Sequence, residues 1–239
     1  MNAKSAQAIL SLAQQSDILI FGETHGTQEV PQVLAAMLDD FRATGFCALG
    51  LEAPLSEQNA LANWAKGETT EAPSFFARPF ADGRGNEQAL ALAREAIRKG
   101  WHVICFDVNS VAPGFVWAER DNGMAENLVA EWERLGPDCK VVCLCGNLHS
   151  RLAPLPKGFA HFWPSFAARI QQLKPNAKVN SINIMFHGGS FFNTKVQQIA
   201  GRPITEDWVS EDAETGHSLV WHLPQATPAT FLAPPTHFF

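Results

Sequence analysis

The chain has 239 residues, 46% of them hydrophobic and 18% charged, which is typical of a globular protein and excludes a disordered or fibrous one. Its formal net charge at pH 7 is −6, and its 18 Lys and Arg residues are scattered along the chain. No basic excess is left to neutralise phosphates, so we expect no nucleic-acid partner.

No apolar run reaches the roughly 20 residues that a membrane-spanning helix needs, and the first residues lack the apolar centre of a signal peptide. We therefore expect a cytoplasmic protein without a membrane partner. The length suits one large domain, and no linker, repeat or low-complexity segment divides it. We predict a single domain over residues 1–239.

The first predicted unit is a strand, a loop and a helix. Residues 17–21 form a short apolar run that is typical of a strand buried on both faces. A loop with Glu23 and His25 follows, bracketed by glycines that allow close approach of a ligand. Apolar residues then recur at helical spacing over about 28–44.

The same unit recurs in the next segment. Residues 46–51 predict a second strand that ends at Glu52, and a helix follows over about 54–66. Residues 67–85 are rich in Pro, Gly and Phe and lack periodicity. They predict a long loop that could form a lid or a pocket wall.

Two further strands complete the part of the chain with the clearest pattern. Asn86 can cap a helix that stops at Gly100, and residues 101–106 predict a third strand ending at Asp107. A fourth helix is expected from about Phe115, and a fourth strand leads to His149. The fourth strand spans 140–145, and weaker signals predict a helix over 165–173 and strands over 179–186 and 218–223.

Alternating strands and helices predict an α/β fold with a mostly parallel central sheet and helices on both faces. Ligands bind such sheets outside the carboxyl ends of the strands. The residues that directly follow predicted strands, and so gather along that rim, are Glu23, His25, Glu52, Asp107 and His149. Carboxylates and imidazoles brought together can bind a divalent metal ion, or tune one another for acid and base chemistry.

Each of these residues also has an ordinary structural interpretation. An acidic residue after a strand, such as Asp107, is commonly a turn former or helix cap. Arg120, near the start of the fourth helix, is either a solvated surface residue or a group that stabilises an anionic intermediate. His187 precedes two glycines after a predicted strand and is a reserve candidate for the rim.

Five cysteines lie in or next to apolar strand-like runs, at Cys47, Cys105, Cys139, Cys143 and Cys145. Their setting predicts buried, reduced thiols. The C-x-C pair in the fourth strand places two sulfurs on one face and could hold a soft metal ion. Since no second pair exists, we interpret these cysteines as core residues.

Four motifs together resemble one known superfamily. They are FGETHGTQE at 21–29, LGLE at 49–52, RDNGMAEN at 120–127, and KVV leading to GNLH over 140–149. The superfamily groups erythromycin esterase-like proteins, haem-binding ChaN lipoproteins, and the Tiki and TraB proteins. The resemblance covers about 17–151, implies the α/β fold of these proteins, and places their functional positions at Glu23, His25, Glu52, Arg120 and His149.

The resemblance implies two kinds of hydrolysis. In esterase-like members the first-motif histidine, here His25, is thought to be a general base that activates water without a metal. In Tiki-like members the corresponding motif is associated with metal-dependent peptide cleavage. A divalent ion such as Mn or Zn would then lie among Glu23, His25, Glu52 and His149.

This sequence departs from the family in three respects. The esterases usually carry one more residue between the glutamate and histidine of the first motif, and typical macrolide esterases are longer, which puts a macrolactone substrate in doubt. ChaN binds haem through tyrosine and carries a lipid-anchored export signal. Because this chain contains no tyrosine and no such signal is recognised, haem as a cofactor is disfavoured.

We therefore expect a hydrolase of an ester or related acyl bond in a small or medium substrate. His25 would be the general base, Glu23 and Glu52 would orient it, and Arg120 with His149 would stabilise the oxyanion. A non-catalytic module that binds haem or another anionic ligand at the same rim is the alternative, and a scaffold with a vestigial rim is the third possibility. Neither the physiological substrate nor the oligomeric state is indicated.

Overall fold

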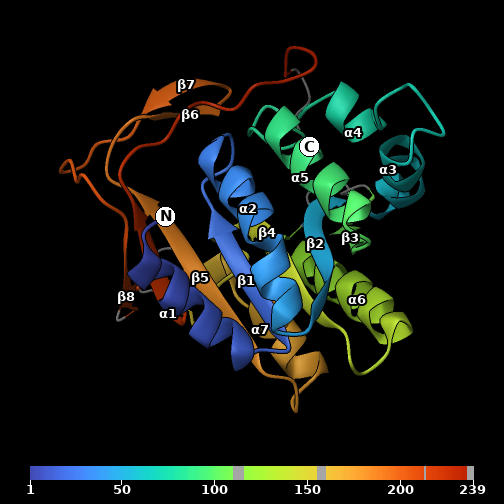
Figure 1. Ribbon diagram of the computed structural model, residues 1–239, viewed down its shortest axis with the longest axis horizontal. Helices are drawn as coiled ribbons and strands as arrows, with labels where there is room; N and C mark the ends of the chain where they lie inside the picture. The colour runs from blue at the N-terminus through green and yellow to red at the C-terminus, as the bar shows by residue number, and fades with distance from the viewer. Residues whose placement is uncertain (110–115, 155–159, 213, 236–239) are drawn as a thin grey trace.

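The computed structural model describes residues 1–109, 116–154, 160–212 and 214–235, and its centre is a seven-stranded sheet (Figure 1). The strand order is β3-β2-β4-β1-β5-β9-β8, and every neighbouring pair is parallel except β8 with β9. This confirms the predicted mostly parallel sheet. The strands are β1 (Ile18–Glu23), β2 (Phe46–Pro54), β3 (His102–Asp107), β4 (Lys140–Gly146), β5 (Val179–Phe186), β8 (Trp208–Glu211) and β9 (Leu219–Leu223).

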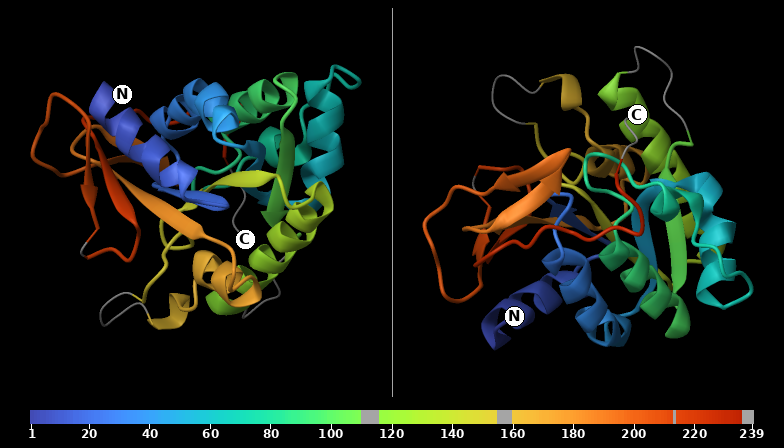
Figure 2. Two further views of the ribbon diagram at one scale, coloured as in Figure 1. Left: turned by 60° about the horizontal axis from the view of Figure 1, so that its bottom comes forward. Right: turned by 90° about the horizontal axis from the view of Figure 1, so that it is seen from above.

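Helices cover both faces of the sheet, as the alternating pattern predicts (Figure 2). One face packs against α1 (Ala3–Gln14), α2 (Glu29–Ala43), α3 (Gln58–Ala65), α4 (Ser74–Ala77) and α5 (Glu87–Arg98). The other packs against α6 (Trp117–Leu135) and α7 (Phe166–Leu173). Among the helices of the described ranges, none combines the length and apolar character needed to cross a bilayer.

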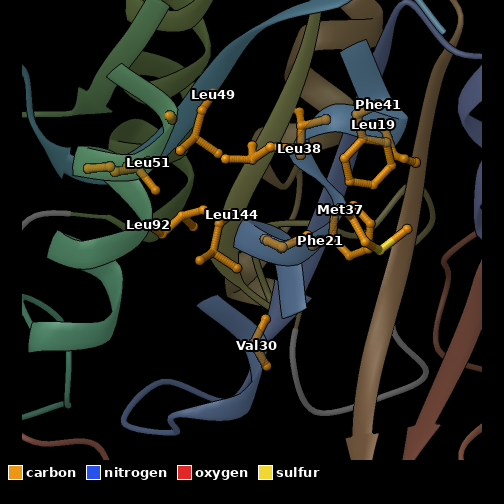
Figure 3. Close-up of a cluster of buried hydrophobic side chains, with 14 of the residues drawn as sticks. Leu19, Phe21, Val30, Met37, Leu38, Phe41, Leu49, Leu51, Leu92 and Leu144 are labelled. Carbon is orange, nitrogen blue, oxygen red and sulfur yellow. The ribbon is translucent and has the colours of Figure 1, made fainter. Parts of the chain in front are cut away.

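The central strand β1 shows how the sequence divides the core between the two faces. All six of its residues are buried, and successive side chains point to opposite faces. Leu19 and Phe21 join the cluster under α2, whereas Ile18 and Ile20 join the cluster under α6 and α7. Figure 3 shows the first cluster, in which the Phe21 ring meets the Phe41 ring edge-on at 5.9 Å between centroids.

Several elements carry no clear signal in the sequence. These are the helix α1, the one-turn helix α4 within the predicted 67–85 loop, the edge strand β8, and a separate hairpin of β6 (Ser190–Asn193) and β7 (Lys195–Gln198). The predicted cap does form, since the Asn86 side chain accepts a hydrogen bond from Ala89 N at 2.8 Å. The predicted helix start at Phe115 lies outside the described residues.

Two cysteines correct the prediction that these residues are all reduced thiols. Cys47 and Cys139 form a disulfide with their Cα atoms 5.4 Å apart, although 92 positions separate them in the sequence. The pairing follows from the sheet, because Phe46 and Lys140 are register partners at the start of the parallel strands β2 and β4. Periodicity along a single strand contains no information about which strand lies beside it.

The other three cysteines agree with the prediction. Cys105, Cys143 and Cys145 are free and buried. Burial raises the pKa of the Cys105 thiol to about 12 and raises the pKa values of Cys143 and Cys145 as well. These side chains are therefore neutral core groups at physiological pH.

The disulfide predicts the result of thiol labelling. Protein purified without reductant and then fully denatured should react with three equivalents of maleimide, and with five after reduction. Mass spectrometry would count the labels. Cys47→Ser is the control, because it leaves Cys139 without its partner and should make all remaining cysteines reactive without reduction. Labelling of all five cysteines in unreduced wild-type protein would contradict the disulfide.

Candidate active site

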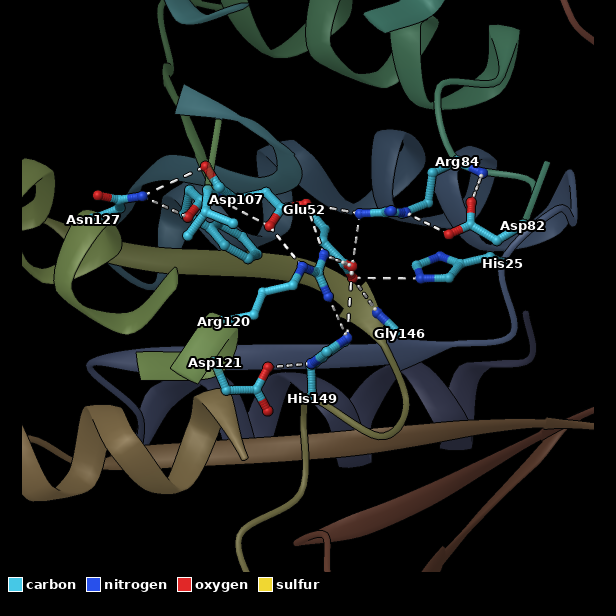
Figure 4. Close-up of polar contacts among 12 residues, drawn as sticks. His25, Glu52, Asp82, Arg84, Asp107, Arg120, Asp121, Asn127, Gly146 and His149 are labelled. Carbon is cyan, nitrogen blue, oxygen red and sulfur yellow. Dashed lines mark hydrogen bonds and ion pairs between the residues drawn. The ribbon is translucent and has the colours of Figure 1, made fainter. Parts of the chain in front are cut away.

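Four neighbouring strands, β1 to β4, bring their carboxyl ends to one edge of the sheet, and a cavity of about 510 Å³ lies there. The five residues that the sequence analysis assigns to the chemistry line it, namely Glu23, His25, Glu52, Arg120 and His149, whereas Asp107 of the predicted rim does not. Figure 4 shows His25, Arg84 and Arg120 pointing toward Glu52. The rim expected from strand ends is therefore a real meeting point of these side chains.

Close backbone packing brings the GNLH turn against β1. Glu23 ends β1 beside Gly146, which ends β4, and Asn147 N donates to the Glu23 carbonyl at 2.9 Å. A Cβ on Gly22 would lie 2.0 Å from Ser150 Oγ, so only glycine leaves room for this turn. The first and fourth motifs thus meet through their glycines, which places His149 at the same cavity as Glu23.

The imidazole of His25 lies between two carboxylates. Its Nδ1 is 2.9 Å from Glu23 Oε1, and its Nε2 is 3.4 Å from Glu52 Oε2. Burial alone would lower the pKa of His25, but the Glu52 and Glu23 carboxylates outweigh burial and raise it to about 10. His25 is therefore an imidazolium at neutral pH, which is not the resting state of a general base.

The two glutamates that hold His25 have opposite pKa shifts. Burial raises the pKa of Glu23, and the attraction to His25 offsets this only in part. Burial would also raise the pKa of Glu52, but the His25 imidazolium and the two arginines Arg84 and Arg120 hold it well below its ordinary value. Glu52 is thus an ionised carboxylate, whereas Glu23 is the carboxyl group that can gain a proton.

Two arginines share the carboxylates of Glu52 and Asp107. Arg120 donates through Nη2 to Glu52 and to Asp107, both at 2.7 Å, and through Nε to Asp107 at 3.0 Å. Arg84 Nη1 contacts the same two carboxylates at 3.0 and 2.8 Å. Arg120 is accordingly a buried residue of the site and not a solvated one, and Asp107 holds both arginines in addition to accepting the Val108 N–H.

The protonation of His149 follows from its neighbours. Arg120 Nη1 lies 2.9 Å from His149 Nε2, and a guanidinium can only donate, so Nε2 carries no proton. The ring proton is then on Nδ1, which lies 2.5 Å from Asp121 Oδ1. His149 is a neutral imidazole oriented by Asp121.

Sequence reasoning missed three charged residues of the site. Arg84 and Asp82 come from the 67–85 segment, where Asp82 accepts the Arg84 Nε–H at 2.9 Å and lines the cavity. The expectation that this segment forms a pocket wall agrees with that position. Asp121 directly follows Arg120 in the third motif, so the motif itself was the signal that could have found it.

Aromatic side chains form another part of the cavity wall, and the Trp117 ring lies 5.9 Å from the Arg120 guanidinium. Trp117, at the start of α6, lines the cavity together with Phe191 and Asn193 of the β6–β7 hairpin. The hairpin is held in place because Phe192 N donates to the Gly26 carbonyl at 3.0 Å. No pattern in the sequence pointed to this hairpin.

Two other histidines lie outside the cavity. His187, the reserve candidate, does not line it, and its Nε2 is 2.9 Å from His222 Nδ1. His217 contacts the Ser150 hydroxyl at 2.8 Å, and burial lowers its pKa to about 4. His217 therefore supports the GNLH turn as a neutral ring.

The donor set, as arranged, does not fit a divalent metal ion. Glu52 accepts from two arginines and from Gly146 N at 2.8 Å, and both nitrogens of His149 are already bonded. In the ranges that the structure covers, no group of three or more His, Cys, Asp or Glu side chains is placed to hold a metal. The Mn or Zn site expected from the Tiki-like resemblance would require these ion pairs to rearrange.

Comparison with known proteins identifies the architecture. No protein-family model and no curated protein matches the chain. A solved erythromycin esterase mutant in its open conformation matches with a TM-score of 0.64 and 10% identity, over 96% of this chain and 95% of that one. The chain has the erythromycin esterase fold.

Other solved structures share this fold. A succinoglycan biosynthesis protein matches with a TM-score of 0.72 at 8% identity, over 94% of this chain and 91% of that one. The type III effector HopBA1 matches with a TM-score of 0.56 at 16% identity, over 89% and 90%. At these identities the likeness is one of fold, and it confirms the architecture that the four motifs indicate.

The opposite environments of two histidines predict their titration. In NMR spectra of the ring resonances, His25 should stay protonated until the pH approaches about 10, because Glu52 and Glu23 raise its pKa to about that value. His217, the internal control, should stay neutral down to about pH 4. His25→Gln and His217→Gln would assign the signals. A titration midpoint of His25 near 6.5 would contradict the stabilisation of its imidazolium by Glu23 and Glu52.

Proposed function

We propose that the chain is a hydrolase of an ester or related acyl bond in a small or medium substrate. The observation that carries the proposal is a pair of glutamates with opposite pKa shifts, both in contact with the His25 imidazolium at one cavity. Enzymes that use acid and base catalysis commonly contain two titratable groups whose environments shift their pKa values in opposite directions. The fold is shared with an esterase, which is consistent with the proposal without deciding the chemistry.

Hydrolysis needs a positive region where charge develops on the acyl oxygen. His25 and Arg120 supply fixed positive groups at the cavity, and neither has to reorganise during the reaction. Trp117 and Phe191 supply apolar contact for the rest of the substrate. A volume of about 510 Å³ suits a small or medium molecule, since ligand pockets commonly measure ~300–1,000 Å³.

The charge balance of the site favours a neutral substrate over an anionic one. Among the described residues, the carboxyl groups are Glu23, Glu52, Asp82, Asp107 and Asp121, and the cations are Arg84, Arg120 and His25. Carboxyl groups are in excess, so an anionic ligand would add to an unfavourable negative charge. An uncharged acyl ester adds none.

Substitution of His25 tests the proposal. With a panel of activated acyl esters, His25→Gln should reduce kcat/KM by ~10²-fold or more, because the imidazolium next to the reacting oxygen is lost. The matched control is His102→Gln, an exposed histidine at the start of β3, at the opposite end of the strand from the site. An equal loss of kcat/KM in both variants would show that the loss does not arise from the cavity.

Metal content and ligand binding separate the proposal from its alternatives. We expect ester turnover to survive exhaustive chelation, because the donor set as arranged suits no divalent ion. A near-stoichiometric metal ion that is lost together with turnover in His25→Gln would instead favour a metal-dependent hydrolase. Absence of turnover, together with a stoichiometric haemin Soret shift that His25→Gln abolishes, would favour the binding module.

A further inference from the structure

A buried carboxyl oxygen of Glu23 has no hydrogen-bond partner within the described ranges. Glu23 is 7% exposed, and its Oε1 contacts His25 Nδ1, but its buried Oε2 has no hydrogen-bond partner among the described residues. Glu52, by contrast, uses both oxygens, since Oε1 accepts from the two arginines and Oε2 accepts from Gly146 N. A buried carboxyl oxygen without a partner is costly unless it takes a proton or a ligand.

The space around Glu23 gives such a partner access. Glu23 lines the 510 Å³ cavity and also an adjoining hollow of about 30 Å³ that His25 and Glu52 share. A hollow of that size has room for about one water molecule. Glu23 therefore borders both the cavity where a substrate would bind and a hollow that can hold about one water molecule, while its Oε2 atom is itself buried.

The neighbouring groups have fixed protonation states. His25 keeps its proton at neutral pH because carboxylates face both ring nitrogens. Glu52 stays ionised between two arginines, and the Nε2 atom of His149 accepts from Arg120. Among the described residues that line this cavity, Glu23 is the carboxyl group whose burial favours the neutral acid and whose second oxygen is unpartnered.

We propose that Glu23, and not His25, is the proton-transfer group of the hydrolase, acting through Oε2. This inference rests on the proposed function. The water oxygen forms a bond to the acyl carbon while one water proton passes to Glu23 Oε2, and the acyl oxygen becomes an oxyanion beside His25 and Arg120. When the bond to the leaving oxygen breaks, Glu23 returns the proton to that oxygen, so the products are a carboxylic acid and an alcohol.

His25 then has a positioning and electrostatic role. Its Nδ1–H holds Glu23 Oε1, which fixes the direction in which Oε2 faces. Its second N–H lies toward Glu52, which keeps the ring charged throughout the cycle. In this arrangement the histidine of the first motif positions Glu23, while its own proton is held too tightly to exchange near neutral pH.

The decisive variants are Glu23→Gln and Glu23→Ala. Glu23→Gln keeps the size of the side chain and should lower kcat by ~10²–10⁴-fold with a smaller change in KM, because proton transfer is lost. Glu23→Ala leaves space in which added formate can replace the carboxylate and should recover activity at least ~10-fold, as expected for general-base catalysis. If Glu23→Gln retains kcat within a few-fold of wild type, or if formate fails to rescue Glu23→Ala, the proposal is overturned.

Glu57→Gln is the matched control. Glu57 is also a buried glutamate with one oxygen bonded, to Ser74, and the other unpartnered, but it does not line the cavity. The variant should keep the wild-type kcat, and formate should have no effect on it. A loss of kcat in Glu57→Gln as large as that in Glu23→Gln would assign the effect to protein stability and overturn the proposal.

A measurement without turnover distinguishes failure of this inference from failure of the proposed function. The infrared difference spectrum between wild type and Glu23→Gln should contain a protonated carboxyl band that titrates above pH 4.5, the ordinary value for glutamate. If that band titrates as expected but no ester is hydrolysed, the proposed function fails, whereas Glu23 is still a carboxyl group that binds and releases a proton above pH 4.5. If the band is absent above pH 4.5, the inference fails whether or not esters are hydrolysed.

Discussion

The other charged groups of the site are positioned by their contacts with the carboxylate of Glu52. It accepts from Gly146 N of β4, from Arg84 of the 67–85 segment and from Arg120 of α6, and it faces the His25 ring. Buried charges are tolerated only when they are paired and hydrogen-bonded, so each of these groups is placed by its bond to Glu52. The strand β2 therefore supplies the anchor, and the surrounding segments supply cations that fit it.

A substantial part of this arrangement could be predicted from the sequence. Apolar runs and helical spacing locate β1 to β5 and β9, and the rule that ligands bind at carboxyl ends of parallel strands brings Glu23, Glu52 and His149 together. Arg84 could not be found this way, because it comes from a segment without periodicity. The disulfide of Cys47 with Cys139 depends on strand order, which local patterns do not specify.

Protonation states were the least accessible part of the site from sequence. A histidine two residues after a glutamate suggests a base, and only the position of Glu52 on a different strand shows that the second ring nitrogen also faces a carboxylate. Likewise, His149 is neutral because Arg120 donates to it, a contact between residues 29 positions apart. The residue type determines which protonation states are possible, and the neighbours that the fold supplies determine which of them is populated.

The hairpin of β6 and β7 contributes to the wall of the cavity but supplies none of the charged groups described above. Phe191 and Asn193 form part of its wall, yet the hairpin is a separate two-stranded sheet that is joined to the first motif through the Gly26 backbone. The charged groups come instead from strand ends, the 67–85 segment and α6. Substitution of Phe191 or Asn193 would therefore change the shape and polarity of the cavity wall without removing any of the charged groups that are paired with Glu52.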